Sequence, residues 1–416
     1  MAWGRSFRHQ WRPVIVPALA LWFVGSVVSC LWLHPFDVAE YGWYAHQALQ
    51  APLLHRLPLE YPAPALVVFM FPLLLPFSYP WAFAVLAGLV LLFLVMSYEG
   101  PGVAGLDAAA ARRLVLYLAV GASILVTARY DIFVAAATFW SVRAARRDRW
   151  STAWKWSAVG CALKLVPAVL WPAFLIAECR RDRRFPWRRL AWMALTAAVL
   201  AVLPALFDRG GLLNVVHYYT KRPDEIEGVP AGLSLLLDWP HTVIVYSFHS
   251  FNLVNGVSRP MALAVEVGAG LGCLGAWWAQ ARSKISFDAV CLVTLTVAIL
   301  GSKVGSAQYL IWLMPLWALY SVRREWLLAS LVNLAAFPYS TSGGLVMPTH
   351  AFYDSNVLLL LVRNVLVAWG TWTWLRTRTP SEAPDSPVQS RPGGGRLPAR
   401  DTVSEVVDSP GGGVRG

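Results

Sequence analysis

A succession of long apolar segments, separated by short polar breaks, constrains this chain more than any other feature. Residues 13–33 form the first of them and are long enough to cross the hydrocarbon core of a bilayer. Hydrophobic residues make up 57% of the chain and charged residues only 14%. A water-soluble domain cannot bury so much apolar surface. The sequence therefore predicts an all-α, polytopic helical membrane protein.

The apolar runs divide into simple crossings and two exceptions. The simple crossings are residues 13–33, 79–98, 112–128, 131–145, 190–207, 260–281, 285–301, 308–322, 325–340 and 355–375. Residues 61–77 are interrupted by prolines, and we expect them to dip into the interface without crossing. Residues 152–178 lie between two arginine clusters, and we expect a hairpin of two short helices that turns near Lys164 and Pro167. The prediction is about twelve membrane helices.

The placement of basic residues predicts the orientation. Most Lys and Arg residues fall in the short loops on one side of this arrangement and in the segment before residue 13. By the positive-inside rule both termini are then cytoplasmic, in a multi-pass protein of the cell membrane. The net charge of +12 reflects this topology, so we expect no nucleic-acid partner. The remaining polar residues concentrate in the opposite loops, and any chemistry is expected on the extracytoplasmic face.

The last part of the chain has a different composition. From residue 380 onward, Pro, Gly, Ser and mixed charges replace the apolar runs. Such a segment cannot bury a core. We therefore expect a membrane domain at residues 1–378 and a disordered cytoplasmic tail at residues 379–416.

Asp37 is the first candidate for chemistry. It follows the first apolar segment closely, which places a carboxylate at the membrane border, within reach of a lipid-embedded substrate. A short interfacial helix over residues 37–50 would carry Glu40 and Tyr41 on or near the same face. The alternative is that Asp37 only ends the first helix and that the aromatic residues form an interfacial belt.

Two further candidates are charged positions within apolar surroundings. Arg129 and Asp131 separate two apolar segments with almost no loop, where charges are costly unless paired or used. The alternative is an ion pair that caps two helices. Lys164 lies inside the expected hairpin, where an ammonium group could neutralise a lipid phosphate. The alternative is that its side chain reaches back to the interface.

The outward loops add candidates for binding phosphate or sugar. His217, Tyr218 and the Lys221-Arg222 pair lie in loop 208–259, and Arg binds phosphate with bidentate geometry. Such a run is also typical of a solvated loop face. The polar turn that contains Lys303, Gln308 and Tyr309 could bind a sugar or phosphate group, or could be a tight turn between helices.

His350, in the last outward loop, could relay a proton if it faces Asp37, although a lone histidine also serves structural roles. The chain has no Walker A loop, GxSxG elbow, HExxH motif or DxD near Asp37. The five cysteines show no metal-ligand spacing. We therefore expect no cofactor and no bound metal, although Asp37 and Asp131 could come together in space.

The order of several motifs resembles a known family. The motifs are Asp37 with Tyr41, then Tyr61-Pro62-Ala63-Pro64, Arg129-Tyr130-Asp131-Ile132, the hairpin around Lys164, and the helix from Ser306 to Pro315. Together they resemble the polyprenyl-phosphate-sugar-dependent membrane glycosyltransferases of the GT-C type, and most of all family 87, which includes actinobacterial mannosyltransferases. The resemblance covers roughly residues 10–375.

The sequence departs from the family pattern in three places. Ala63 stands where a second proline is expected, Arg129-Tyr130 replaces an amide residue, and Ser306-Ala307-Gln308 replaces a Ser-Pro-Gln pattern. These departures concern donor and acceptor details more than the fold.

The resemblance implies a chemistry. Asp37 would act as general base on an acceptor hydroxyl, which attacks the anomeric carbon of a sugar carried on polyprenyl phosphate. The configuration would invert without a metal, and the acceptor would be a lipid or an envelope glycan. Cationic groups would stabilise the phosphate charge. The candidates for the phosphate are Arg129, Lys164, Arg222 and Lys303. The candidates for lining the substrate path are Tyr41, Tyr61, Asp131, His217, Tyr218, Gln308 and Tyr309, with His350 for proton handling.

Two other classes of protein stay open. A transporter or flippase of a lipid-linked sugar or small solute would place charged groups near the midplane and would show inverted repeats with paired broken helices. Here the ionisable residues gather in the outward loops, and one clear broken hairpin is present, which favours the enzyme. A non-catalytic scaffold is the third reading, because several family motifs are imperfect.

Overall fold

The computed structural model describes residues 2–33, 36–50, 57–58, 60–98, 108–207, 211–341 and 350–377. The predicted tail at residues 379–416 and most of the loop before α17 lie outside these residues. The described chain is mostly helical, and five helices are long and apolar enough to cross a membrane. They contain the segments Pro13–Leu31, Tyr79–Met96, Trp187–Phe207, Ser258–Ala281 and Asp354–Thr377. The protein is therefore a multi-pass helical membrane protein.

The helices follow one another along the chain with short connections. In chain order they are α1 (Ala2–Val27), α2 (Phe36–Leu49), α3 (Leu66–Met70), α4 (Tyr79–Met96), α5 (Ala108–Gly121), α6 (Leu125–Ala128), α7 (Asp131–Arg146), α8 (Trp150–Leu163), α9 (Trp171–Asp182), α10 (Trp187–Phe207), α11 (Gly211–Lys221), α12 (Val229–Leu237), α13 (Ser258–Ala281), α14 (Phe287–Leu300), α15 (Leu310–Tyr320), α16 (Arg324–Thr341) and α17 (His350–Thr377). The strands are β1 (Asp224–Glu225), β2 (Val243–Ser247) and β3 (Ser250–Val254).

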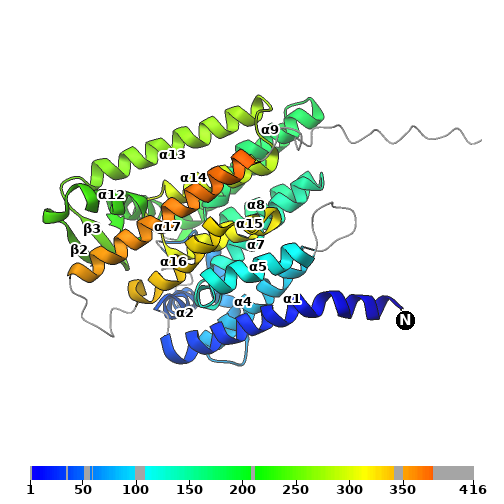
Figure 1. Cartoon of the computed structure of the whole chain (residues 1–416), viewed down its shortest axis with the longest axis horizontal. Coiled ribbons are helices and arrows are strands. Elements are labelled where there is room, and N and C mark those ends of the chain that lie inside the picture. The colour runs from blue at the N-terminus through cyan, green and yellow to red at the C-terminus, as the bar shows by residue number, and fades with distance from the viewer. Residues whose placement is uncertain are drawn as a thin grey trace, which may run out of the picture. The chain divides into compact units, whose positions relative to one another are not determined.

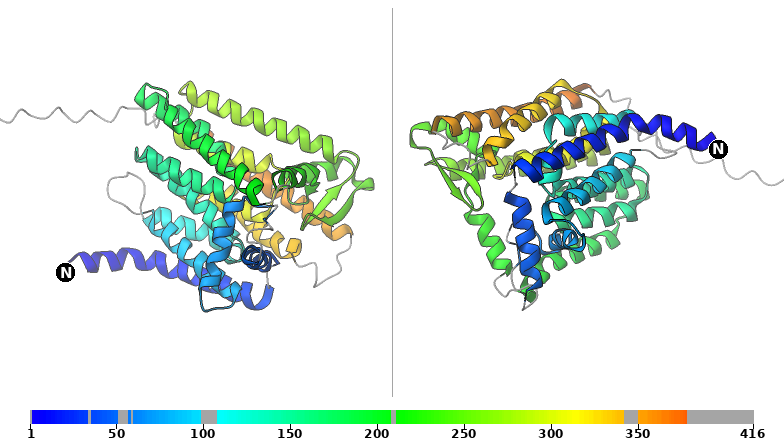
Figure 2. Two further views of the ribbon diagram at one scale, coloured as in Figure 1. Left: turned by 180° about the vertical axis from the view of Figure 1, so that it is seen from behind. Right: turned by 90° about the horizontal axis from the view of Figure 1, so that it is seen from below.

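Long helices lie side by side, and the strands lie at one end of them (Figure 1). The helix α2 runs across the direction of α1, as the view from below shows (Figure 2). Several predicted crossings are interrupted or short. Residues 112–128, for example, divide into α5 and α6. Within the described residues, only the five segments above reach the length and hydropathy of a simple span.

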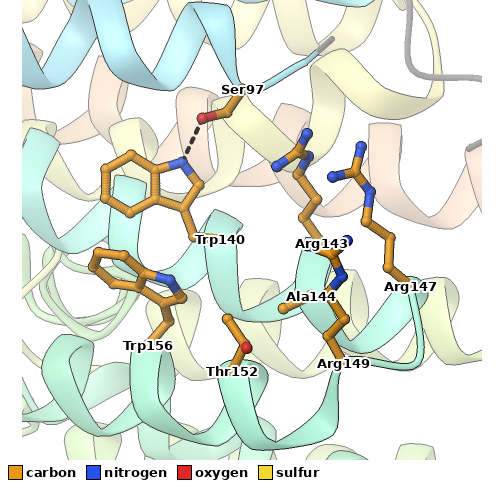
Figure 3. A pocket seen from close by; sticks show the side chains of 8 residues that line it. All are labelled: Ser97, Trp140, Arg143, Ala144, Arg147, Arg149, Thr152 and Trp156. Carbon is orange, nitrogen blue, oxygen red and sulfur yellow. Dashed lines mark hydrogen bonds between the residues drawn. The ribbon is translucent and has the colours of Figure 1, made fainter. Parts of the chain in front are cut away.

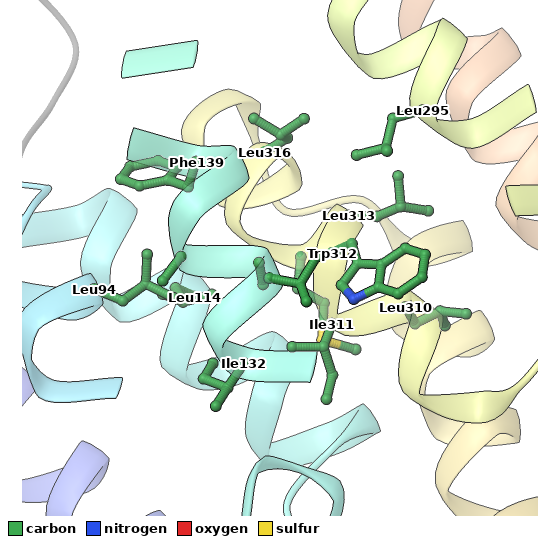
Figure 4. Close-up of a cluster of buried hydrophobic side chains, with 14 of the residues drawn as sticks. Leu94, Leu114, Ile132, Phe139, Leu295, Leu310, Ile311, Trp312, Leu313 and Leu316 are labelled. Carbon is green, nitrogen blue, oxygen red and sulfur yellow. The ribbon is translucent and has the colours of Figure 1, made fainter. Parts of the chain in front are cut away.

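The centre of the bundle is α15. Leu310 through Leu319 are all buried, so this helix is apolar on every side, as expected of a helix inside a bundle. It packs against α5 and α7. Figure 4 shows Ile132 and Phe139 of α7 and Leu114 of α5 in the same cluster of buried side chains as Trp312 and Leu313. This packing holds α7, which carries site residues at its first turn.

The segment from 150 to 182 forms the hairpin that the sequence predicts. The helix α8 ends at Leu163, Lys164 has extended backbone, and Pro167 begins the turn that leads to α9. Trp154, near the start of α8, donates a 2.9 Å hydrogen bond from Nε1 to Oε2 of Glu178, near the end of α9. The two helices are therefore antiparallel, and the turn presents Lys164 to the bundle.

A small antiparallel sheet corrects the all-α expectation. The strand order is β1-β3-β2, with Ile244 opposite Leu253 and Asp224 also opposite Leu253 on the other side. Residues 243–247 are rich in β-branched and aromatic side chains, which fit a pleated surface. The region 208–259, expected as a loop, thus contains α11, α12 and the sheet.

A buried arginine attaches this region to the bundle. Arg363 of α17 is 1% exposed and donates hydrogen bonds from Nη2 to the carbonyl oxygens of Glu227 (2.9 Å) and Gly305 (2.6 Å), and from Nη1 to Oδ1 of Asn333 (2.9 Å). The two backbone segments approach so closely that a Cβ atom at Gly305 would lie 2.5 Å from the carbonyl oxygen of Glu227. The arginine therefore satisfies carbonyl groups that water does not reach.

We expect Arg363→Met to lower the free energy of unfolding by about 3 kcal/mol, because it leaves buried acceptors and the Glu227 carboxylate without their cation. Thermal unfolding in detergent measures the loss. The matched control is Arg324→Met, because the Arg324 side chain is 91% exposed, and its effect should stay within about 0.5 kcal/mol. Equal losses in both variants would contradict this role.

Candidate active site

The first feature of the site is an ion pair between Asp37 and Arg129. Asp37 lies in the first turn of α2, and Arg129 follows the short helix α6, two residues before the first residue of α7. Their side chains contact each other and are 15% and 13% exposed, respectively. An opposite charge at contact distance favours the ionised carboxylate. Asp37 is therefore a partly accessible carboxylate in contact with a guanidinium group.

A second ion pair lies beside the first. Nζ of Lys164 is 3.0 Å from Oδ1 of Asp131, whose side chain is 1% exposed in the first turn of α7. The same Nζ lies 4.6 Å from the ring centroid of Tyr309, 4.8 Å from that of Trp312 and 5.4 Å from that of Tyr130. The electron-rich faces of these rings stabilise the ammonium group.

The two pairs influence each other. Arg129 lies within electrostatic range of Asp131, and Lys164 within range of Arg129. Two carboxylates, from α2 and α7, and two cations, from the segment before α7 and the turn after α8, thus meet in one place. Such a set can supply a base for a hydroxyl and positive charge for a phosphate.

Buried aromatic rings form the wall behind these charges. Tyr41 stacks on Phe69 with ring centroids 4.5 Å apart, and Tyr61 lies 5.1 Å from Tyr130 and 5.7 Å from Tyr41, edge to face. Tyr130 donates a 2.9 Å hydrogen bond to the carbonyl oxygen of Leu163, which fixes the residue before Lys164. These contacts therefore pack α2, α3 and the turn after α8 against one another.

The segment after α11 brings a further cation. Nη2 of Arg222 donates a 2.9 Å hydrogen bond to Oγ of Ser250 and lies 3.7 Å from Oε2 of Glu225. Oγ of Ser306 lies 2.9 Å from both carboxylate oxygens of Glu225. Arg222 is also within electrostatic range of Tyr309. The outer segment and the α15 entry are thus joined at the edge of the charged centre.

A cluster of Glu40, Glu60 and His249 lies at the outer rim. Nδ1 of His249 is 2.6 Å from Oε1 of Glu40 and 3.7 Å from Oε1 of Glu60. Burial, and then the charge of Glu60, raise the pKa of Glu40, whereas His249 lowers it. Oε2 of Glu40 has no hydrogen-bond partner among the described residues. Among the residues that the structure describes, these three side chains lie close enough together to hold a metal ion.

The turn that carries His249 is strained. Phe248 and His249 have φ angles of 52° and 57°, in the left-handed region that glycine and asparagine usually occupy. Tyr218 contacts the Glu60 carboxylate and donates a 3.0 Å hydrogen bond to the carbonyl oxygen of Phe248. The α11 helix thus braces both the turn and Glu60.

The sequence model of glycosyltransferase family 87 matches residues 59–303, more than half of the chain. The chain belongs to glycosyltransferase family 87. The match includes Arg129, Asp131, Lys164 and Arg222, whereas Asp37 precedes it. A search of proteins with curated descriptions found no match. Family membership makes this chain a glycosyltransferase, with a sugar donor and an acceptor as substrates.

In this family 87 protein, most of the candidates from the sequence come together. They are Asp37, Tyr41, Tyr61, Arg129, Asp131, Lys164, Tyr218, Arg222 and Tyr309. His217 is exposed on α11, and Gln308 is half-buried next to Tyr309. Lys303 contributes its carbonyl oxygen to the Glu225 amide, at 3.0 Å, and its side chain lies within electrostatic range of Asp224. His350 begins α17, and its side chain lies outside the described residues.

Sequence reasoning did not select Glu60 or His249 of this glycosyltransferase, and it assigned no role to Glu225 and Ser306, which lie in stretches that it did select. Glu60 directly precedes the Tyr-Pro motif, and its acidic character was a usable signal. His249 had no such signal, because only the β2–β3 hairpin brings it to Glu40. Glu225 and Ser306 meet across a long separation in sequence, and no local pattern indicates that contact.

Asp224 gives the site region a pH dependence. Burial raises its pKa to about 7, Lys303 opposes the shift, and Glu266 adds to it. Between the ordinary value of 3.8 and about 7, the native state holds a proton that the unfolded chain has released. The free energy of unfolding therefore falls as pH rises through this window.

We expect Asp224→Asn to remove this fall in the free energy of unfolding at higher pH. The variant should match the wild type near pH 4 and exceed it by about 1–2 kcal/mol at pH 8, because residual solvent screens part of the effect. Thermal unfolding in detergent across this pH range measures the difference. Parallel stability profiles for the two proteins would contradict the assignment.

Proposed function

We propose that this family 87 glycosyltransferase transfers a sugar, with mannose as the family expectation, from a polyprenyl-phosphate donor. The acceptor is a lipid-linked or cell-envelope glycan, and the reaction takes place on the extracytoplasmic side. The observation that carries the proposal is the pairing of a partly accessible base, Asp37, with cations at one end of the bundle. The reaction inverts the anomeric configuration and needs no metal at the reacting atoms.

In the proposed step, Asp37 accepts the proton of an acceptor hydroxyl. The hydroxyl oxygen bonds to the anomeric carbon while the bond from that carbon to the phosphate oxygen breaks. The leaving group departs as polyprenyl phosphate from the opposite face of the sugar, which inverts the configuration. The base must lie within hydrogen-bond distance of the proton that it takes.

Cations support departure of the phosphate. Arg129 contacts Asp37 and can exchange part of this contact for a phosphate oxygen, because a guanidinium group binds two oxygens at once. Lys164 and Arg222 add positive charge to the same centre, in which a low dielectric strengthens each interaction. Lys303 lies further out, near Asp224, and His350 is a second candidate for proton handling.

The proposed topology follows from the positive-inside rule, which places the basic loops in the cytoplasm and the candidate site on the opposite side. About twelve helices enter or cross the membrane in a domain over residues 1–378, with both termini and the 379–416 tail in the cytoplasm. The sheet, α11 and α12 then lie outside, over the charged centre. The protein resides in the cell membrane.

We expect Asp37→Asn to lower sugar transfer by about 10²–10⁴-fold, because the amide cannot accept the proton. Membranes that contain the protein are supplied with labelled polyprenyl-phosphate sugars, and labelled lipid is extracted and counted. Donor binding should persist in the variant. The matched control is Asp182→Asn, an exposed carboxylate at the end of α9. Unchanged transfer by Asp37→Asn would remove Asp37 from the mechanism. If the wild type instead moves the donor across the membrane without transferring its sugar, the protein would be a flippase.

We expect EDTA to leave the rate of transfer unchanged within about twofold, because an arginine and a lysine supply the positive charge. Addition of Mn²⁺ or Mg²⁺ should likewise have little effect. A loss of activity in EDTA that Mn²⁺ restores would instead assign a cation to Glu40, Glu60 and His249. His249→Gln, tested in parallel, should then show the same loss without EDTA.

A further inference from the structure

A pocket of about 250 Å³ lies at the opposite end of α7 from Asp131. Its lining includes Arg143, Arg147 and Arg149, and Figure 3 shows their side chains extending on the same side of the α7–α8 turn. The helix has 16 residues, so Asp131 and this pocket are separated by about 20 Å along its axis. The pocket is therefore separate from the candidate active site.

The local backbone places the three guanidinium groups together. The amides of Arg147 and Arg149 both donate to the carbonyl oxygen of Ala144, at 3.1 Å and 2.9 Å, and Asp148 has a φ of 57°. This tight C-terminal turn of α7 leads at once into α8. Arg147, one helical turn beyond Arg143, and Arg149, at the start of α8, are therefore held on either side of this turn.

Nearby carboxylates in the surrounding helices and turns form ion pairs with arginines that do not line the pocket. Asp148 accepts a 3.2 Å contact from Arg181 of α9, and Asp288 of α14 lies 3.5 Å from Arg146. Among the described residues, the lining of the pocket contains no acidic side chain. The positive charge of the pocket is thus not balanced from its own walls.

The guanidinium group of Arg147 has hydrogen-bond donors that an anion could accept from. Nε and Nη2 of Arg147 are buried and have no hydrogen-bond partner among the described residues. Burial, and then the charge of Arg149, lower the pKa of Arg147. Buried donors without acceptors are costly, and a phosphate group would satisfy two of them at once.

The other walls suit a lipid headgroup. Trp140 and Trp156 pack with ring centroids 4.5 Å apart, and Nε1 of Trp140 donates a 2.7 Å hydrogen bond to Oγ of Ser97. Thr152 adds a hydroxyl to the lining. Tryptophan is enriched at the membrane–water interface, and basic pockets between membrane helices bind anionic headgroups.

We infer that Arg143, Arg147 and Arg149 form a binding site for a phosphate group, carried by an anionic membrane phospholipid. The site is distinct from the centre around Asp37 and does not depend on the proposed reaction. Its lipid would hold the α7–α8 turn at the membrane surface opposite the active site.

The test uses the purified full chain in nonionic detergent, with three probes at equal ionic strength: phosphatidylglycerol, phosphatidylcholine and inorganic phosphate. Native mass spectrometry counts bound lipid, and thermal unfolding measures stabilisation by each probe. We expect phosphatidylglycerol to bind and stabilise, phosphatidylcholine to do neither, and inorganic phosphate to stabilise only at much higher concentration.

Two pairs of substitutions locate the binding. Arg147→Gln with Arg149→Gln should weaken phosphatidylglycerol binding by about tenfold or more. The control, Arg183→Gln with Arg184→Gln, removes equal charge just after α9, whose Arg181 contacts Asp148, and should change binding by less than about twofold. Arg147→Lys with Arg149→Lys keeps the charge and should retain part of the affinity, which separates binding from misfolding.

Equal weakening in the pocket and control pairs would overturn the site, because the effect would then be general surface charge. Full binding by the Gln pair would overturn it as well. Equal stabilisation by inorganic phosphate and phosphatidylglycerol would overturn the assignment to a lipid and identify a soluble phosphate ligand.

Discussion

The buried pair of Lys164 and Asp131 is the interaction on which the rest of the site depends. It joins the end of α8 to the start of α7, and neither charge could remain there without the other, because an isolated buried ion is strongly destabilising. The partial positive charge at the start of α7 favours Asp131, and three aromatic rings surround the ammonium group. With these two residues fixed, Arg129 is positioned two residues before the first residue of α7, where it meets Asp37.

The part of the chain between α10 and α13 gives this centre an outer wall. The Tyr218 and His249 side chains connect that wall to Glu60 and Glu40, Glu225 connects it to Ser306, and Arg363 connects it to α17. The candidate site residues therefore lie between the helix bundle and a polar cover. A glycosyltransferase benefits from such an arrangement, because excluding water reduces hydrolysis of the sugar donor.

Local patterns in the sequence predict much of this arrangement. Hydropathy indicates the long helices, Pro167 between arginine clusters indicates the hairpin, and charged residues in apolar surroundings indicate Arg129, Asp131 and Lys164. What could not be predicted depends on contacts between distant segments. The Arg363 network, the Ser306–Glu225 contact and the approach of His249 to Glu40 exist only after the chain has folded. The sheet was missed for another reason, because the region was treated as a loop although residues 243–247 are rich in β-branched and aromatic side chains.

The turn at Phe248 and His249 has a consequence for how the outer wall moves. Two non-glycine residues with positive φ cost on the order of 1 kcal/mol each. The contacts of His249 with Glu40 and of Tyr218 with the Phe248 carbonyl offset this cost only while they are made. Breaking them releases the strain, so the hairpin tip has a smaller free energy of local opening than the helices behind it. Among the described elements around the candidate site, the hairpin tip is therefore the part that we expect to open first.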